Sequence, residues 1–277
     1  MLLALPFPMI DPVLVEIGPF AIRWYALAYI AGIVLGWLLA RRLVALPPAV
    51  ASREQLDDYV TWATLGIILG GRLGYVLFYR PGHFLSHPAE ILAVWQGGMS
   101  FHGGMLGVIL ATLLFCRWQG IDPLGFGDRI APVVPIGLLF GRLANFINGE
   151  LWGRVTDLPW GMVFPTGGPE PRHPSQLYQA GLEGLVLLAL LLVLVHRSAI
   201  RARRGFLTGA FLAGYAVARL VGELFRQPDA HLGFLFGGVT MGQLLSLPML
   251  AAGLWLMARA RGGVRPPQRA TVAPPAD

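Results

Sequence analysis

The sequence contains no lysine: all 21 basic residues among its 277 are arginine. It also has few charges of either sign, 13% of residues, where a soluble globular protein usually carries about 25%. A nucleic-acid-binding protein would gather its basic residues on a polar surface, whereas these arginines are scattered between long apolar runs. These shortages exclude nucleic acid as a partner and argue against a water-soluble domain.

Cysteine is almost absent as well. The single residue, Cys116, excludes an intramolecular disulfide framework and a cysteine-based zinc site. There is no CxxC, HExxH or Walker-type phosphate loop, and no group of Asp, Glu and His has the spacing of metal ligands. We therefore expect neither a metal nor a cofactor. Residues 1–20 lack a basic start and a small-residue cleavage site, so we expect no signal peptide.

Long apolar runs dominate what is present. A helix needs about 20 mostly apolar residues to cross a bilayer, and the runs lack both the polar face of a surface helix and the alternation of barrel strands. The sequence predicts an all-α polytopic membrane protein, with residues 1–258 as one domain of seven transmembrane helices. The expected spans are 22–43, 58–79, 98–117, 127–147, 176–196, 205–225 and 237–258.

The charges of the loops predict how these spans are oriented, because cytoplasmic loops carry an excess of Arg and Lys. With the N-terminus outside, twelve arginines fall on the inner side and five on the outer side. We therefore expect the N-terminus outside and the C-terminus inside. Residues 259–277, rich in Pro, Arg and Ala, are expected to form a disordered cytoplasmic tail.

One outer segment, residues 148–175, is long for a connection. It contains Trp152, Trp160 and Phe164 together with several Gly and Pro residues, and it is too apolar for a solvated linker. We interpret it as a small folded head at the membrane surface, with its tryptophans at headgroup level. The alternative is an ordinary long loop.

Three arginines lie inside predicted spans, where a charge costs at least ~2.5–3.5 kcal/mol. Arg72, Arg142 and Arg219 each stand about 15 residues from the inner end of their span, which at the rise of a helix is about 20 Å. They should therefore share one level in the outer half of the bilayer. His102, near the outer start of the third span, falls at the same level. Such a convergence indicates a functional site, although Arg72 is the member best explained as structural.

Helical spacing suggests partners for these groups. Tyr215, Arg219 and Glu223 follow one another at intervals of four residues and lie on one stripe, so Arg219 and Glu223 are expected to pair. Asn145 shares the face of Arg142.

Other groups have simpler interpretations. A pair between Glu150 and Arg154 is expected at the entrance to the head, and Glu183 in the fifth span is interpreted as an ion-pair partner for an arginine. Cys116, at the inner end of its span, is interpreted as structural. The glycines, including Gly103 and Gly104, most simply indicate close helix contact or a locally opened backbone.

Arginine pairs are typical of phosphate sites, because the planar guanidinium matches phosphate oxygens. At this depth the available phosphate is that of a phospholipid, and a nearby His is suited to act as a general base. The sequence has no strong signal for its own nucleophile, which favours direct transfer of a lipid group to an incoming acceptor. A lipid or small-anion transporter is the alternative from another class, although no polar level appears in the inner half. A lipid-phosphate phosphatase would need an acidic, His-rich motif that is missing.

Several motifs, in order along the chain, resemble the prolipoprotein diacylglyceryl transferase family. The most specific is GRLANFINGE at 141–150. The others are GGRLGYVLFY at 70–79, SFHGGMLG at 100–107, RHPSQLY at 172–178, and the positions of Arg23, Trp24 and Tyr25 and of Tyr215, Arg219 and Glu223. The similarity extends from about residue 9 to residue 258.

The resemblance implies an enzyme of the bacterial inner membrane with its active site toward the periplasm. It would transfer the diacylglyceryl group of phosphatidylglycerol to the lipobox cysteine thiol of a prolipoprotein, and release glycerol phosphate. It implies His102, Arg142 and Arg219 as catalytic residues. The residues implied to bind phosphatidylglycerol are Arg142, Arg219, Tyr25, Asn145, Glu150, Tyr215, Glu223, Gly103 and Gly104.

Overall fold

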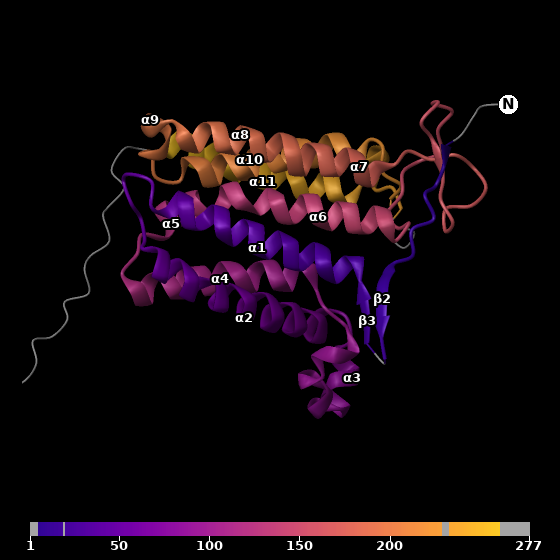
Figure 1. Cartoon of the computed structure of the whole chain (residues 1–277), viewed down its shortest axis with the longest axis horizontal. Helices are drawn as coiled ribbons and strands as arrows, with labels where there is room; N and C mark the ends of the chain where they lie inside the picture. The colour runs from indigo at the N-terminus through magenta and orange to yellow at the C-terminus, as the bar shows by residue number, and fades with distance from the viewer. Residues whose placement is uncertain (1–4, 19, 229–232, 261–277) are drawn as a thin grey trace, which may run out of the picture. The chain divides into compact units, whose positions relative to one another are not determined.

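The computed structural model describes residues 5–18, 20–228 and 233–260, and most of them are helical (Figure 1). They form two compact units. The first comprises the described residues up to 40 and those from 127 onward, and the second comprises residues 41–126.

The first unit contains eleven helical elements and four short strands, among the residues described. In chain order they are β1 (Leu5–Pro6), β2 (Val13–Ile17), β3 (Phe20–Arg23), most of α1 (Trp24–Val44), the end of α5 (Pro123–Ile130), η3 (Ala131–Val133), α6 (Val134–Ile147), β4 (Met162–Val163), α7 (Ser175–Gln179), the π-helical η4 (Ala180–Val186), α8 (Leu187–His196), α9 (Ser198–Arg201), α10 (Phe206–Glu223), η5 (Phe236–Gly238) and α11 (Met241–Arg259).

The core of this unit lies between α8 and α10, which run side by side in Figure 1. Leu187, Leu191 and Ala210 are almost completely buried there. The start of α10 is fixed by Asp128, whose carboxylate accepts hydrogen bonds from the backbone N–H groups of Gly205 (2.6 Å) and Thr208 (2.7 Å). Because these N–H groups have no partner within the helix, the cap defines where α10 begins.

The second unit is built on α2 (Arg53–Phe78) and α4 (Phe101–Gln119), with α3 (Pro81–Ser86), η1 (Pro88–Leu92) and η2 (Val94–Gln96) between them. The two long helices approach closely at their glycines, because a Cβ atom on Gly103 would overlap the backbone oxygen of Gly70. This confirms the prediction of close helix contact at Gly103.

Arg72 has a structural role, as predicted. Its side chain is buried and donates hydrogen bonds to the backbone oxygens of Ile91 (2.9 Å), Gly97 (2.6 Å) and Glu90 (2.5 Å). It therefore holds the α3–η2 segment against the end of α2. Cys116 is buried, which fits its interpretation as structural.

The predicted spans coincide with helices whose ends differ by a few residues. Among the described residues, six helices are long and apolar enough to cross a membrane: Trp24–Val44, Arg53–Phe78, Phe101–Gln119, Pro123–Ile147, Ser175–His196 and Met241–Arg259. The predicted span 205–225 corresponds to α10, which is not among the six. The charged residues Arg219 and Glu223 lower its hydropathy.

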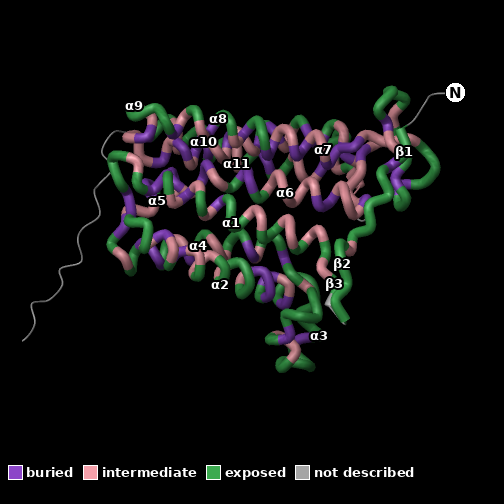
Figure 2. The backbone as a smooth tube through the Cα atoms, in the orientation of Figure 1, coloured by how far each residue is buried: buried purple, intermediate pink, exposed green. Residues whose placement is uncertain are grey.

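The described residues are mostly helical, as expected, but they also contain two short two-stranded sheets that were not predicted. β2 and β3 form an antiparallel hairpin whose second strand includes Ile22 and Arg23, where the first span was predicted to begin. The local sequence favours this hairpin. Val13–Ile17 is rich in β-branched residues, which favour strands, and Gly18, between the two strands, has a positive φ of 59°. The hairpin is largely exposed (Figure 2).

The segment 148–175 is folded rather than an open loop. Its strand β4 pairs in parallel with β1, and isolated bridges join Val155 and Met162 to Arg172. Phe164 packs on the ring of Phe7, with 5.1 Å between the ring centroids. The predicted head therefore includes part of the N-terminal segment as well. Of the predicted disordered tail 259–277, residues 261–277 lie outside the described residues.

Candidate active site

Two arginines from different helices face one carboxylate. Arg142 on α6 donates hydrogen bonds from Nε (3.1 Å) and Nη2 (3.0 Å) to Oε2 of Glu183. Nη1 of Arg219 on α10 lies 3.7 Å from Oε1 of Glu183. The Glu183 side chain is fully buried, whereas the two guanidinium side chains are 14% exposed. The interpretation of Glu183 as an arginine partner is thus confirmed.

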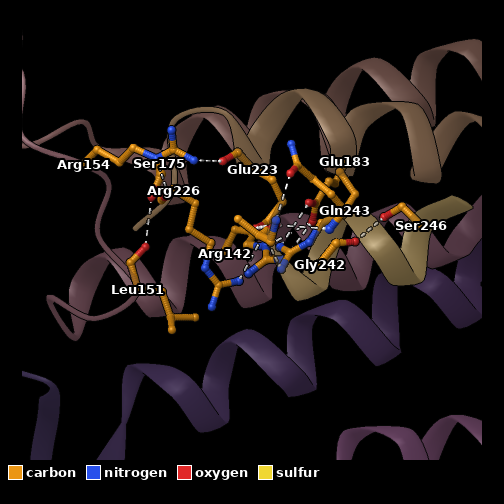
Figure 3. Close-up of polar contacts among 12 residues, drawn as sticks. Arg142, Leu151, Arg154, Ser175, Glu183, Glu223, Arg226, Gly242, Gln243 and Ser246 are labelled. Atoms are coloured by element: carbon orange, nitrogen blue, oxygen red, sulfur yellow. Dashed lines mark hydrogen bonds and ion pairs between the residues drawn. The ribbon is translucent and has the colours of Figure 1, made fainter. Parts of the chain in front are cut away.

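Glu183 lies in the π-helical segment η4. A π segment inserts extra backbone into a helix and turns the following side chains, and such segments are frequent at functional sites. This local departure from α-helix, directly before α8, gives Glu183 its direction between α6 and α10 (Figure 3).

Arg219 has a second carboxylate partner on its own helix. Its Nη2 lies 2.7 Å from Oε1 of Glu223, which confirms the predicted pair four residues apart. Among the described residues, this oxygen has no partner with hydrogen-bond geometry, so the contact is an ion pair, and Nη1 of Arg226 lies 3.9 Å from the same oxygen. The other oxygen, Oε2, accepts a hydrogen bond of 2.6 Å from Oγ1 of Thr240. Thr240 is also the N-cap of α11, so Glu223 joins the end of α10 to the start of α11.

A small cavity of about 30 Å³ adjoins this group. Its lining includes Arg219, Glu223 and Arg226 together with Thr240 and Gly242. The cavity therefore has guanidinium, carboxylate and hydroxyl groups within reach, and a polar ligand placed there would meet the Arg219–Glu223 pair.

The end of α6 fixes Asn145 and Glu150. The amide Nδ2 of Asn145 donates to Oε1 of Glu150 at 2.8 Å. Leu151, with a positive φ of 57°, turns the chain here, and its carbonyl accepts from Oγ of Ser175 at 2.9 Å (Figure 3). The carbonyl of Glu150 accepts from Nε2 of Gln176 at 2.6 Å. A left-handed residue other than glycine is strained and marks a constrained position.

The predicted pair between Glu150 and Arg154 is wrong. Glu150 pairs with Asn145 as described, and Arg154 donates instead to the backbone oxygens of Glu223 and Arg226. The prediction rested on the short separation of the two residues in sequence, but residues 148–154 turn at Gly149 and Leu151, both with positive φ.

The remaining predicted residues lie in different places. Tyr25 is at the start of α1, with its ring 5.2 Å from that of Tyr29, and Tyr215 packs on the α8–α10 core. His102, Gly103 and Gly104 are at the start of α4, in the second unit, where His102 is exposed. The structure brings together Arg142, Arg219 and Glu223 as predicted. His102 lies in the second unit, residues 41–126.

Thr240 is a partner of Glu223 that was not predicted from the sequence. The pattern Thr240–Gln243 before an apolar run is a recognisable capping box, and the structure contains it. That signal marks the start of α11, but not the hydrogen bond across to α10.

The fold and the site together define a helical membrane protein with two arginines held around a buried carboxylate. The partly exposed guanidiniums are suited to bind an anionic ligand such as a phosphate ester. The model of the family "prolipoprotein diacylglyceryl transferase" matches residues 12–259.

Relatives with the name phosphatidylglycerol–prolipoprotein diacylglyceryl transferase match nearly the whole chain. The protein of Paramagnetospirillum magneticum is 60% identical over 93% of this chain and 96% of its own length. That of Gluconacetobacter diazotrophicus is 60% identical over 94% of each chain, and that of Nitrobacter hamburgensis is 55% identical over 99% of this chain and 97% of its own. The chain belongs to the prolipoprotein diacylglyceryl transferase family, and is thus a transferase.

Proposed function

We propose that this protein transfers the sn-1,2-diacylglyceryl group of phosphatidylglycerol to the lipobox cysteine thiol of prolipoproteins, the first step of bacterial lipoprotein maturation. The observation that carries the proposal is the pair Arg142 and Arg219, which converge on Glu183 in a chain of this family. The substrates are those named for the relatives of this chain.

In the proposed reaction the cysteine thiolate attacks the glyceryl carbon that carries the phosphate. A sulfur–carbon bond forms, the carbon–oxygen bond breaks, and glycerol phosphate leaves with the electron pair of that bond. The thiol proton passes to a general base. Nucleophile and leaving group both come from the substrates, so the step needs no added cofactor.

Each residue has a proposed role in this step. Arg142 and Arg219 bind the phosphate and stabilise the charge that develops on the leaving group, and Glu223 orients Arg219. His102 takes the thiol proton. Tyr25, Asn145, Glu150, Tyr215, Gly103 and Gly104 are proposed to position the lipid headgroup.

We also propose how the chain lies in the membrane. Residues 1–258 form one domain of seven transmembrane helices in the bacterial inner membrane, with α10 as the sixth. The N-terminus is outside, residues 259–277 are a cytoplasmic tail, and the site and the head 148–175 face the periplasm. The support is the excess of arginine in the loops assigned to the inner side.

The decisive experiment combines the purified chain, phosphatidylglycerol vesicles and a lipobox peptide. We expect the peptide to gain the mass of one diacylglyceryl unit, and a peptide with Ser in place of its Cys to gain none. A chain that moves lipid or anions across the vesicle without modifying the peptide would instead be a transporter.

Two variants test the assigned roles in the same assay. Arg142→Ala should lose most of the activity, and normal transfer by this variant would contradict the phosphate clamp. His102→Gln should also be strongly impaired. If it keeps a nearly normal rate, an arginine or the lipid phosphate is the base instead of His102.

A further inference from the structure

The folded head reaches the candidate site through Arg154. Its guanidinium donates from Nε to the backbone oxygen of Arg226 (3.1 Å) and from Nη2 to that of Glu223 (3.1 Å) (Figure 3). The last carbonyls of a helix have no partner within it, and a cation there is favoured by the helix dipole. Arg154 thus caps α10 at the residue whose carboxylate holds Arg219.

The main chain around Arg154 strengthens this attachment. Its N–H donates to the backbone oxygen of Phe225 at 2.8 Å, and the N–H of Gln227 donates to that of Trp152 at 3.3 Å. Gly153 forms an antiparallel bridge with Arg226. Residues 152–154 therefore lie as a short strand along residues 225–227.

The face of the same guanidinium contacts the segment that precedes α11. The Cζ atom of Arg154 lies 5.0 Å from the ring centroid of Phe234, a cation–π distance. Six residues later Thr240 donates its hydroxyl to Glu223. One side chain of the head therefore contacts both segments that hold the Glu223 carboxylate.

We propose that Arg154 is a positioning residue for the transfer reaction. It fixes Glu223, and through Glu223 the Arg219 guanidinium, in the arrangement that binds the lipid phosphate. The inference rests on the proposed function. Arg154 contacts the backbone oxygens of Glu223 and Arg226 and the ring of Phe234. Its effect should therefore appear in turnover rather than in the binding of the peptide substrate.

The chain offers a matched control in Arg172. This arginine also lies in the head and also donates to backbone oxygens, those of Gly167 (2.7 Å) and Gly153 (3.3 Å). It stacks on Trp152, with its Cζ atom 4.2 Å from the ring. These partners all lie within the head, so the loss of Arg172 should disturb the head without releasing the end of α10.

The test compares Arg154→Gln, Arg154→Lys and Arg172→Gln in the full chain, in phosphatidylglycerol vesicles with a lipobox peptide. We expect Arg154→Gln to lower kcat about tenfold more than Arg172→Gln, with little change in KM for the peptide, because a misplacement of about 1 Å near reacting groups can cost on the order of a hundredfold in rate. Arg154→Lys should restore part of kcat, since an ammonium can still donate to one carbonyl.

Equal losses in Arg154→Gln and Arg172→Gln, together with equal losses of thermal stability, would overturn the inference, because the head would then matter only as a structural unit. If Arg154→Gln does not fold, the comparison is made with Arg154→Lys, which keeps the charge.

Hydrogen exchange separates this inference from the proposed function. The amides of residues 224–227 and 241–244 should exchange faster in Arg154→Gln than in Arg172→Gln. Unchanged exchange in both would overturn the positioning role. A wild-type chain without transferase activity would refute the proposed function, and the exchange result would still decide whether Arg154 holds the end of α10.

Discussion

Oε2 of Glu183 accepts two hydrogen bonds from the guanidinium of Arg142, at 3.1 and 3.0 Å, in a pair whose carboxylate is fully buried. The other oxygen of Glu183 faces Arg219 at 3.7 Å. One carboxylate therefore orders both arginines of the proposed phosphate clamp. Its removal would leave two partly exposed guanidinium groups without their shared, buried counter-charge. Breaking a pair with a buried member costs up to about 3–5 kcal/mol.

The first prediction is that Glu183→Ala strongly lowers the thermal unfolding midpoint and abolishes transfer. Glu183→Gln should be milder, because its amide oxygen still accepts hydrogen bonds from Arg142 while the negative charge is lost. The measurement is thermal unfolding in detergent, paired with the vesicle assay.

A control for this prediction is the Arg41–Asp57 pair, whose side chains are 34% and 36% exposed. Asp57→Asn should change stability by less than about 1 kcal/mol, because solvent screens a pair whose side chains are only partly buried. A Glu183→Ala chain as stable as Asp57→Asn would show that Glu183 does not hold the cluster together.

The second prediction concerns Gly153, where the head meets the end of α10. A Cβ atom there would lie 2.6 Å from each of three atoms: Cβ and O of His173 and O of Phe225. Two of these are backbone atoms, which cannot move aside as a flexible side chain can. Gly153→Ala should therefore separate the head from α10 and greatly reduce both activity and stability.

Gly82→Ala is the matched control, because a Cβ atom at Gly82 meets nothing within 4 Å. It should leave the unfolding midpoint and the activity close to those of the wild type. Equal behaviour of the two alanine variants would refute the assigned close approach at Gly153.

Contacts that follow from regular spacing along a helix could be predicted from the sequence. Regular spacing predicted that Arg142 and Arg219 would lie at one level and that Arg219 would pair with Glu223, and the structure confirms the pair. Glu183 stood out as a carboxylate in an apolar span. Its direction depends on the π-helical turn of residues 180–186, which has no simple sequence signature.

Contacts of residues that lie outside the helices could not be predicted in the same way. The predicted Glu150–Arg154 pair rested on the short separation of the two residues in sequence, in a segment that turns at Gly149 and Leu151. The contacts of Arg154 with the end of α10, about 70 residues away in sequence, depend on tertiary structure. Such long-range contacts follow from how the segments pack and not from any local pattern.

The third prediction distinguishes two roles for neighbouring glycines of α4. A Cβ atom on Gly103 would overlap the backbone of α2, whereas one on Gly104 would meet its nearest atom at 3.5 Å, an ordinary van der Waals contact. Gly103→Ala should therefore lower the unfolding midpoint, and Gly104→Ala should leave it nearly unchanged.

The activity of these variants tests the proposed headgroup contact. Gly104→Ala should raise KM for phosphatidylglycerol at normal stability if the lipid approaches this backbone. A Gly104→Ala enzyme with wild-type stability and wild-type KM would remove Gly104 from the proposed binding residues.

The last prediction is that the stability of the protein depends on pH through His173 in the head. Burial first, and then the positive charge of Arg154, hold the pKa of His173 below its ordinary value of 6.5. The Nε1–H of Trp160 donates to the hydroxyl of Tyr178 (2.7 Å), and this hydroxyl lies 3.2 Å from Nδ1 of His173. A neutral His173 can accept the hydroxyl proton at Nδ1, whereas a His173 protonated there cannot.

The sign of the effect follows from linkage. Above pH 6.5 His173 is neutral in both the folded and the unfolded chain, so it contributes no pH dependence. As the pH falls through 6.5 and then through the lowered value, the unfolded chain binds a proton before the folded one does, and stability is lost. The unfolding midpoint of the wild type should therefore fall over this range more steeply than that of His173→Gln, whose side chain does not titrate.

The variant Arg154→Gln provides a second test, because it removes one of the two causes that lower the pKa of His173. The pKa of His173 in this variant should move back toward 6.5, which can be followed by NMR titration of the imidazole. A His173 pKa that is identical in the wild type and in Arg154→Gln would mean that burial alone lowers it, and that Arg154 directs its charge only toward the end of α10.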